Sequence, residues 1–261
     1  VLFFNFRKDR PRQLSSALFQ KDFERFERPG RGPVHLTCMT EYDHWWRVPF
    51  AFAQDRPQVT LAKVLSKAGL RQFHCAETEK YAHVTFFLNG GHGDPYPGEE
   101  REIVPSPQVA TYDLKPEMSA PQVADEVIKA LESDDYAFVV VNFANGDMVG
   151  HTAVREAILE AVECMDREVG RVLDVAVKLG YSTILTADHG NCDELVDPVS
   201  GARQTQHSVY PVPLMVVDEV AWRLSGEGGL ANVAPTVLHL MGLPKPAGMT
   251  EDSLLLGPVR P

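Results

Sequence analysis

The chain has 261 residues, which is enough for one large domain or two modest ones. Hydrophobic residues make up 44% of the sequence and charged residues 23%, proportions that allow a packed core and exclude global disorder. With 25 Lys and Arg against 36 Asp and Glu, the formal net charge is -11, so we expect the chain to repel nucleic acids and anionic membranes and to attract cations.

Strand-like and helix-like patterns alternate along the chain. The residues VLFFNF (1–6) predict a buried strand, LSSALF (14–19) a short helix and VHLTCM (34–39) a second strand. Residues 42–57 are rich in aromatic residues and proline without a clear period, and we interpret them as a connection. The remaining helices are predicted over 59–69, 79–88, 121–133, 154–179 and 233–242. The remaining strands are predicted over 71–77, 136–143, 182–187 and 213–218.

This alternation predicts an α/β layered domain with a mostly parallel sheet. The four cysteines are far apart and form no C-x-x-C pair, which predicts reduced thiols and a cytoplasmic protein. No apolar run approaches the ~18 residues of a transmembrane helix, and the first residues do not have the features of a signal peptide. The sequence begins without Met and within a strand-like pattern, so we expect its front to be missing.

Residue types that bind metals follow two of the predicted strands. In NGDMVGH, Asp147 and His151 are four residues apart and would share one face of a helix. In TADHGN, Asp188 and His189 can converge only in a turn, which Gly190 permits. His207, in QTQHSVYPVP, precedes the last predicted strand. Ligands of open α/β sheets bind at the carboxyl ends of strands, where these residues are expected.

Each of these motifs alone also fits an ordinary structural role, as a surface ion pair, a helix cap, a turn or a structural histidine. Their convergence on one sheet edge of an acidic chain favours a metal site. Mixed carboxylate and imidazole ligands suit Mn or Zn, and two ions close together commonly serve phosphoryl transfer.

Three basic residues could contact an anionic substrate. Arg7 and Arg10, in FRKDR, have the guanidinium shape that binds phosphate or carboxylate, although their spacing alone favours an exposed charge cluster. Lys80, in ETEKYAH, is an ordinary helix lysine unless the fold places it in a cleft.

Six segments together resemble one enzyme family: FNFRKDR, MTEYD, AETEKYAHVTFFLNGG, VVVNFANGDMVGHT, TADHGNCDE and HSVYPVP. They are similar to the cofactor-independent (2,3-bisphosphoglycerate-independent) phosphoglycerate mutases, in the expected order over nearly the whole chain. The resemblance implies an alkaline-phosphatase-like fold and the interconversion of 3-phosphoglycerate and 2-phosphoglycerate in glycolysis. It also implies a phosphoserine intermediate and two divalent ions, usually manganese.

The resemblance further implies roles for the individual residues. Asp147, His151 and His207 would hold one manganese ion, and Asp188 and His189 the other. The substrate phosphate or carboxylate would be bound by Arg7 and Arg10, and the catalytic Lys80 would lie beside the phosphoryl group.

The chain departs from the family at its front. There, the family's N-terminal segment supplies an Asp ligand, the nucleophilic Ser and most of a transferase lobe, and no serine here matches the nucleophile motif. Ser208, beside His207, is not a substitute. We expect residues 1–54 to be the remnant of the transferase lobe with a linker, and residues 55–261 to be the metal-binding phosphatase-like lobe. The partner would be the missing N-terminal segment, and no oligomer is expected of the intact enzyme.

Two other functions stay open. One is a metal-dependent phosphatase or phosphodiesterase of the same superfamily, against which the Arg7 and Arg10 pair and the ETEKYAH segment argue. The other is a non-catalytic metal-binding fragment, because five candidate side chains are few for two ions that need about four ligands each. Without the nucleophile, this chain alone is expected to be inactive.

Overall fold

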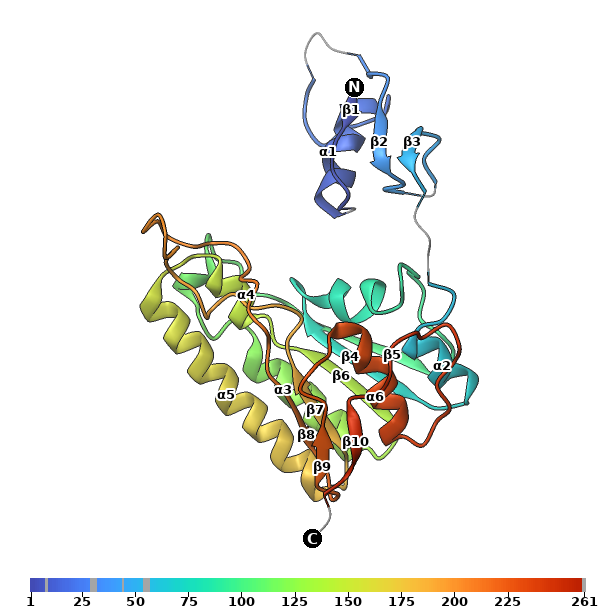
Figure 1. The fold of residues 1–261 in the computed structure, drawn as a ribbon. Helices are drawn as coiled ribbons and strands as arrows, with labels where there is room; N and C mark the ends of the chain where they lie inside the picture. The colour runs from blue at the N-terminus through green and yellow to red at the C-terminus, as the bar shows by residue number, and fades with distance from the viewer. Residues whose placement is uncertain (8, 29–31, 44, 54–56, 260–261) are drawn as a thin grey trace. The chain divides into compact units, whose positions relative to one another are not determined.

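The computed structural model describes residues 1–7, 9–28, 32–43, 45–53 and 57–259 (Figure 1). The chain forms two compact units, Val1–Arg56 and Pro57–Pro261. Each of the four cysteines is a free thiol, as the sequence predicts. Among the described residues, no helix combines the length and the apolar character needed to cross a bilayer.

The first unit is a small parallel sheet with one helix. Strands β1 (Leu2–Phe3), β2 (Thr37–Thr40) and β3 (Phe50–Phe52) lie in that order, and α1 spans Asp9–Phe19. The expected buried strand over residues 1–6 is wrong: only two residues pair, and the Phe4 and Phe6 side chains are exposed. The connection predicted over 42–57 is also wrong in part, since it contains β3. All three β3 side chains are exposed, so the strand carries no alternating pattern.

The second unit is built on a three-stranded parallel sheet. Strand β4 (Gln72–Glu77) is central and wholly buried, between β5 (Glu99–Val104) and β6 (Phe138–Asn142). The sequence did not predict β5, because the polar segment EEREIV forms an edge strand with mostly accessible side chains and has no apolar run.

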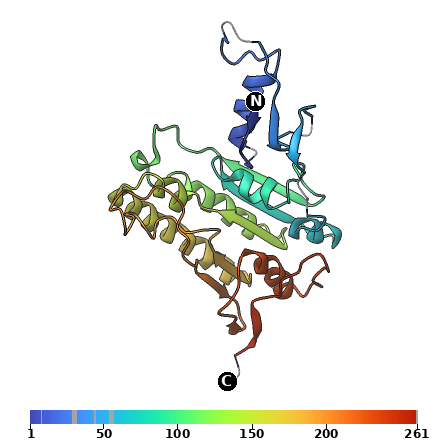
Figure 2. The ribbon, with the colours of Figure 1, turned by 45° about the horizontal axis from the view of Figure 1, so that its top comes forward.

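Helices cover both faces of this sheet. On one face, α3 (Ala120–Glu132) and α5 (Arg155–Lys178) lie alongside each other (Figure 1, Figure 2) and pack on Phe73 and Cys75 of β4. On the other face, α2 (Leu61–Lys67) and α6 (Val233–Leu240) pack on Phe138. Alternate residues of a strand point to opposite faces, which explains how one sheet fills both cores. The predicted α/β layering with parallel strands is confirmed.

Shorter elements complete the unit. Two antiparallel pairs join β7 (Thr183–Thr186) to β8 (Leu214–Val217) and β9 (Trp222–Leu224) to β10 (Leu255–Pro258). The remaining short elements are α4 (Asn145–Gly150) and the 3-10 turns η2 (Tyr112–Leu114) and η3 (Leu230–Asn232). The helix predicted over 79–88 is confirmed in place but is shorter and differs in type: residues 81–87 are helical, the part His83–Phe87 (η1) is a π-helical turn, and residues 78–80 form a turn before it.

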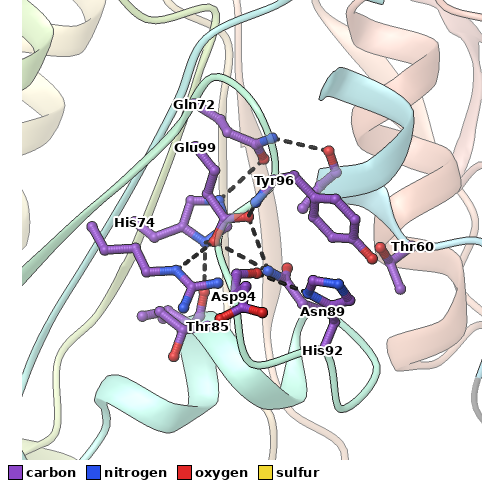
Figure 3. Close-up of polar contacts among 12 residues, drawn as sticks. Thr60, Gln72, His74, Thr85, Asn89, His92, Asp94, Tyr96 and Glu99 are labelled. Atoms are coloured by element: carbon purple, nitrogen blue, oxygen red, sulfur yellow. Dashed lines mark hydrogen bonds and ion pairs between the residues drawn. The ribbon is translucent and has the colours of Figure 1, made fainter. Parts of the chain in front are cut away.

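A buried polar network secures β4 to its surroundings (Figure 3). The Gln72 amide donates to Ala62 O in α2 at 2.9 Å, and its Oε1 lies 3.1 Å from His74 Nε2. His74 Nδ1 lies 2.6 Å from Val84 O in η1. These contacts fix the strand that leads directly to Lys80.

The same network continues into β5 through Glu99, whose carboxylate faces donors from three directions (Figure 3). Asn89 Nδ2 donates to its two oxygens at 3.0 and 3.1 Å, the Tyr96 backbone N–H at 3.0 Å, and Arg101 Nε at 2.6 Å. The segment between η1 and β5 is thereby held against the sheet.

Candidate metal centre

Helix α4 presents the first two candidate ligands. It follows β6 after two residues, and its buried Val149 packs into the core formed with Ala157, Ile158 and Ala161. Asp147 lies in the first turn of α4 and His151 directly follows the helix, so the pair shares one side of it.

The two side chains meet a third at a single oxygen atom. Asp147 Oδ1 lies 3.1 Å from His151 Nε2 and 3.0 Å from His207 Nε2. The candidate ligand atoms of Asp147, His151 and His207 all lie within 4.8 Å of one another. The carboxylate is mostly buried, whereas both imidazoles are accessible to solvent. The structure thus brings His207 to two residues that lie 56 (207 − 151) and 60 (207 − 147) positions before it in the sequence.

The backbone around His151 decides which ring nitrogen can bind a cation. His151 Nδ1 lies 2.7 Å from the carbonyl oxygen of Thr205, so this nitrogen carries the proton in the neutral imidazole. The lone pair of Nε2 then faces Asp147 Oδ1. The lone pairs of these two atoms repel at this distance unless they bind a proton or share a metal ion, and metal-binding histidines commonly donate their other N–H to a carbonyl group. The donor set therefore fits a divalent cation.

His207 reaches this point because two distant loops pair. Gly190 and Ser208 form an isolated antiparallel bridge, in which the Ser208 N–H donates to Gly190 O at 3.0 Å. A Cβ atom on Gly190 would overlap the Ser208 hydroxyl oxygen and the Asp193 carboxylate, so a side chain at this position would displace both. Ser208 Oγ donates to Asp193 at 2.9 Å, a structural role that agrees with its exclusion as a nucleophile.

The same bridge stacks two imidazole rings. The centroids of His189 and His207 are 3.6 Å apart, with 14° between the ring planes. Partial burial and the neighbouring His189 lower the pKa of His207 although Asp147 opposes the shift, which favours the neutral form that can bind a metal. His189 Nε2 also lies 3.6 Å from Asp188 Oδ2. The structure therefore pairs Asp188 with His189, beside the Asp147 group and outside it.

Lys80 lies in the turn after β4, where its side chain is buried. Its Nζ forms a close ion pair with Asp147 Oδ2, the oxygen that does not face the histidines. Burial favours the neutral acid, but the hydrogen bond and charge of Lys80, together with the Asn191 amide and His151, hold the pKa of Asp147 well below its usual range. Lys80 is therefore a buried residue of this site, and its predicted position beside a phosphoryl group stays a prediction.

Arg7 and Arg10 belong to the first unit. Arg10 lies in α1, and Arg7 precedes this helix, with its backbone N–H donating to Asn5 Oδ1 at 2.9 Å. Both side chains are exposed. Their predicted contact with substrate stays a prediction.

Sequence reasoning missed Asn191, which contacts the central carboxylate directly. Its Nδ2 donates to Asp147 Oδ1 at 2.9 Å. The only signal was its place in TADHGN, two residues after His189. The next residue, Cys192, donates through Sγ to Gly146 O at 2.7 Å, and burial raises its pKa to about 11, so it is a structural thiol here.

Proteins of similar sequence are known. The family model of the Metalloenzyme superfamily matches residues 24–245, and a model described as BPG-independent PGAM N-terminus matches residues 1–44. A 2,3-bisphosphoglycerate-independent phosphoglycerate mutase of Symbiobacterium thermophilum is 53% identical over 261 residues, which cover 98% of this chain and 50% of that protein. A protein of the same name from Pseudomonas fluorescens is 48% identical over 259 residues, which cover 99% and 50%.

A solved structure gives the same result. Leishmania mexicana phosphoglycerate mutase at low cobalt concentration superposes with a TM-score of 0.87 and 34% identity, over 98% of this chain and 50% of that chain. The chain spans about half the length of the relatives it matches. The resemblance drawn from the six sequence segments is confirmed, and so is the alkaline-phosphatase-like fold class.

Proposed function

The chain belongs to the Metalloenzyme superfamily, and from this membership we propose that it is part of a 2,3-bisphosphoglycerate-independent phosphoglycerate mutase. The intact enzyme would interconvert 3-phosphoglycerate and 2-phosphoglycerate in glycolysis, in the cytoplasm and without forming an oligomer. The observation that carries the proposal is the Asp147 carboxylate, which faces two imidazoles with one oxygen and Lys80 with the other.

Two manganese ions are proposed as the metals. Asp147, His151 and His207 would hold one, and Asp188 and His189 would contribute to the other. When bound, such ions screen the charge of a phosphoryl group and lower the pKa of a serine hydroxyl. The remaining ligands and the nucleophilic serine would come from outside this chain.

The chain's own residues would bind and orient the substrate. Lys80 places a cation within the buried site, next to the carboxylate, where a phosphoryl oxygen of the substrate could share it. Arg7 and Arg10 would bind the phosphate or carboxylate of phosphoglycerate, which has to reorient between the two transfers. In this proposal residues 1–54 are the transferase remnant and residues 55–261 the metal-binding lobe, and the division of the chain into the units Val1–Arg56 and Pro57–Pro261 supports it.

The sheet of the second unit supports a contribution from further polypeptide. The Tyr181 hydroxyl donates to Tyr136 O at 2.8 Å, each residue lying two positions before its strand, and Asn191 donates to Asp147 O at 3.2 Å, each lying five positions after its strand. The two strands therefore run in the same direction, yet within residues 57–259 no ladder joins them. Every residue of both strands is only half-buried. We infer that a strand from polypeptide outside this chain pairs here.

A chimera tests the mutase activity. We expect the Symbiobacterium thermophilum relative to convert 3-phosphoglycerate to 2-phosphoglycerate in the presence of manganese after this chain replaces its matched half, because the two are 53% identical there. Arg10→Ala in the chimera should lower turnover at least about 10-fold, the loss of one charged substrate contact, without changing its manganese content. Phosphorus NMR identifies the products.

Release of free phosphate would instead support the hydrolase of the same superfamily. A folded chimera that binds manganese but forms neither 2-phosphoglycerate nor free phosphate would contradict both activities. The alternative of a non-catalytic metal-binding fragment would then remain.

A manganese titration tests the metal site in this chain alone. We expect one tight ion and a second weak one, because the first site has three side chains here and the second only two. His207→Ala should weaken the tight site by at least about 100-fold, since losing a ligand should exceed the effect of losing a hydrogen bond to one. His189→Ala, the comparison variant, should weaken the tight site less than His207→Ala does, because it removes a ring that stacks on a ligand and leaves all three ligands in place. Electron paramagnetic resonance of free manganese gives both numbers.

Two equally tight ions, or a tight site indifferent to His207, would contradict this assignment.

A further inference from the structure

Asn191 holds both the main chain and the side chain of a single neighbour. Its side chain is buried, and the Nδ2 atom donates to Asp147 O at 3.2 Å and to Asp147 Oδ1 at 2.9 Å. One amide group thus spans the backbone and the carboxylate of the same residue. This restricts rotation of the Asp147 side chain, because any large turn breaks one of the two contacts.

The contact restrains the plane in which the carboxylate presents one oxygen to the histidines. Lys80 holds Oδ2 of Asp147 from one side, and by itself a single ammonium group leaves the carboxylate free to pivot. Asn191 holds Oδ1 from another side, at the position where this oxygen lies about 3 Å from both imidazoles. Two separate donors therefore fix two separate oxygens.

The orientation of the Asn191 amide is itself determined. Both atoms that face Nδ2 are acceptors, so the reversed amide would place an oxygen against a carbonyl and a carboxylate. The Asn191 Oδ1 atom has no hydrogen-bond partner among the described residues. It lies against Gly150, where a Cβ atom would come within 2.5 Å of it. The absence of a side chain at Gly150 is what allows the amide to approach α4.

We propose that Asn191 is a positioning residue, which turns the Asp147 carboxylate so that Oδ1 can join His151 and His207 in binding a divalent cation. This inference rests on the metal site proposed above. Asn191 follows His189 by two residues, so the amide also couples the turn that carries the second pair of candidate ligands to the helix that carries the first.

The test uses manganese alone as the probe and this chain as it stands. Asn191→Leu keeps a similar volume and removes the donor. Asn145→Leu is the matched control, because Asn145 is also buried, lies on α4 and donates to Pro116 O at 2.8 Å, not to the carboxylate. Both variants should lower the midpoint of thermal unfolding. Only Asn191→Leu should weaken manganese binding, by about 10–100-fold, the usual effect of losing a hydrogen bond to a metal ligand.

Electron paramagnetic resonance of the bound ion separates positioning from a general loss of stability. Asn191→Leu should change the zero-field splitting of bound manganese, whereas Asn145→Leu should leave it as in the original chain. Gly150→Ala offers a second approach that retains the amide and displaces it, and it should weaken manganese binding in the same direction. It replaces Asn191→Leu if that variant does not fold.

The outcomes distinguish the two proposals. If the original chain binds no manganese, the metal site fails and the positioning role fails with it. If the original chain binds manganese and both Asn191→Leu and Gly150→Ala bind it equally well, only the positioning role is overturned. Equal weakening by Asn145→Leu and Asn191→Leu would also overturn it, because the effect would then follow from stability alone.

Discussion

Lys80→Met is expected to lower the free energy of unfolding of the second unit by about 3–5 kcal/mol, the usual effect of leaving one partner of a buried ion pair alone. The side chains of Lys80 and Asp147 are 7% and 14% exposed. The loss of Lys80 therefore leaves a carboxylate that water can hardly reach, next to the Asn191 amide and the two imidazoles. Asp147→Asn should be harmful for the converse reason, since it leaves the ammonium group unpaired.

A double-mutant cycle separates the pair from its surroundings. Lys80→Met combined with Asp147→Asn should lose less stability than the sum of the two single changes, because no charge is then left buried. Lys129→Met is the matched control. Its ion pair with Glu126 lies on the surface, with side chains 67% and 34% exposed, and should contribute less than about 1 kcal/mol.

Urea unfolding, followed by amide hydrogen exchange in β4 and α4, measures these differences in the second unit alone. A Lys80→Met variant that is no less stable than Lys129→Met would contradict the buried ion pair between Lys80 and Asp147.

The parts of the fold that the sequence predicted are those where burial leaves a pattern. Strand β6 reads as an apolar run, and α5 repeats apolar residues at helical spacing, because each contributes to a continuous core. Strands β3 and β5 lie at sheet edges and expose most of their side chains, so nothing in FAF or EEREIV distinguishes them from loops. Their pairing depends on backbone contacts with distant partners.

The residues of the candidate metal site also differ in how far a local sequence pattern predicts them. Asp147 and His151 are predictable because a helix brings residues four positions apart onto one face. His207 lies beside Asp147 because of the bridge between Gly190 and Ser208, and Lys80 lies beside it because of the turn after β4. Both are long-range contacts that no local spacing encodes. The metal-binding residue types indicated the chemistry, and only the fold shows which of them meet.

The second large effect is expected at Glu99, in the network that holds β4 and β5 together. Every group that contacts this carboxylate closely is a donor: the Asn89 amide, the Tyr96 backbone N–H and the Arg101 guanidinium. In Glu99→Gln, the new NH₂ group must face at least one of these donors, and Arg101 loses its buried counter-charge. We expect this variant to be less stable by about 3–5 kcal/mol.

The adjacent residue provides the control. Glu100 lies on the same strand with its side chain 51% exposed, paired with Arg71 and Tyr136 at the surface. Glu100→Gln should therefore change the free energy of unfolding by less than about 1 kcal/mol. Urea unfolding at neutral pH compares the two variants, and equal losses would contradict a special role for the buried carboxylate.

The pH dependence of stability provides a second readout of the same network. Burial lowers the pKa of His74, and the attraction of Glu99, 3.9 Å away, opposes this shift only in part. Below about pH 6.5, His74 is therefore protonated more readily in the unfolded chain than in the folded protein. The free energy of unfolding should therefore not depend on His74 above that pH. On acidification it should decrease through His74 by at most about 1.4 kcal/mol per pH unit.

Without the Glu99 charge, the pKa of His74 should fall further, so in Glu99→Gln this decrease in the free energy of unfolding should continue to lower pH. Glu100→Gln should follow the original chain, and NMR titration of the His74 ring checks the order directly. A His74 that gains its proton at higher pH in Glu99→Gln than in the original chain would contradict the sign of this coupling.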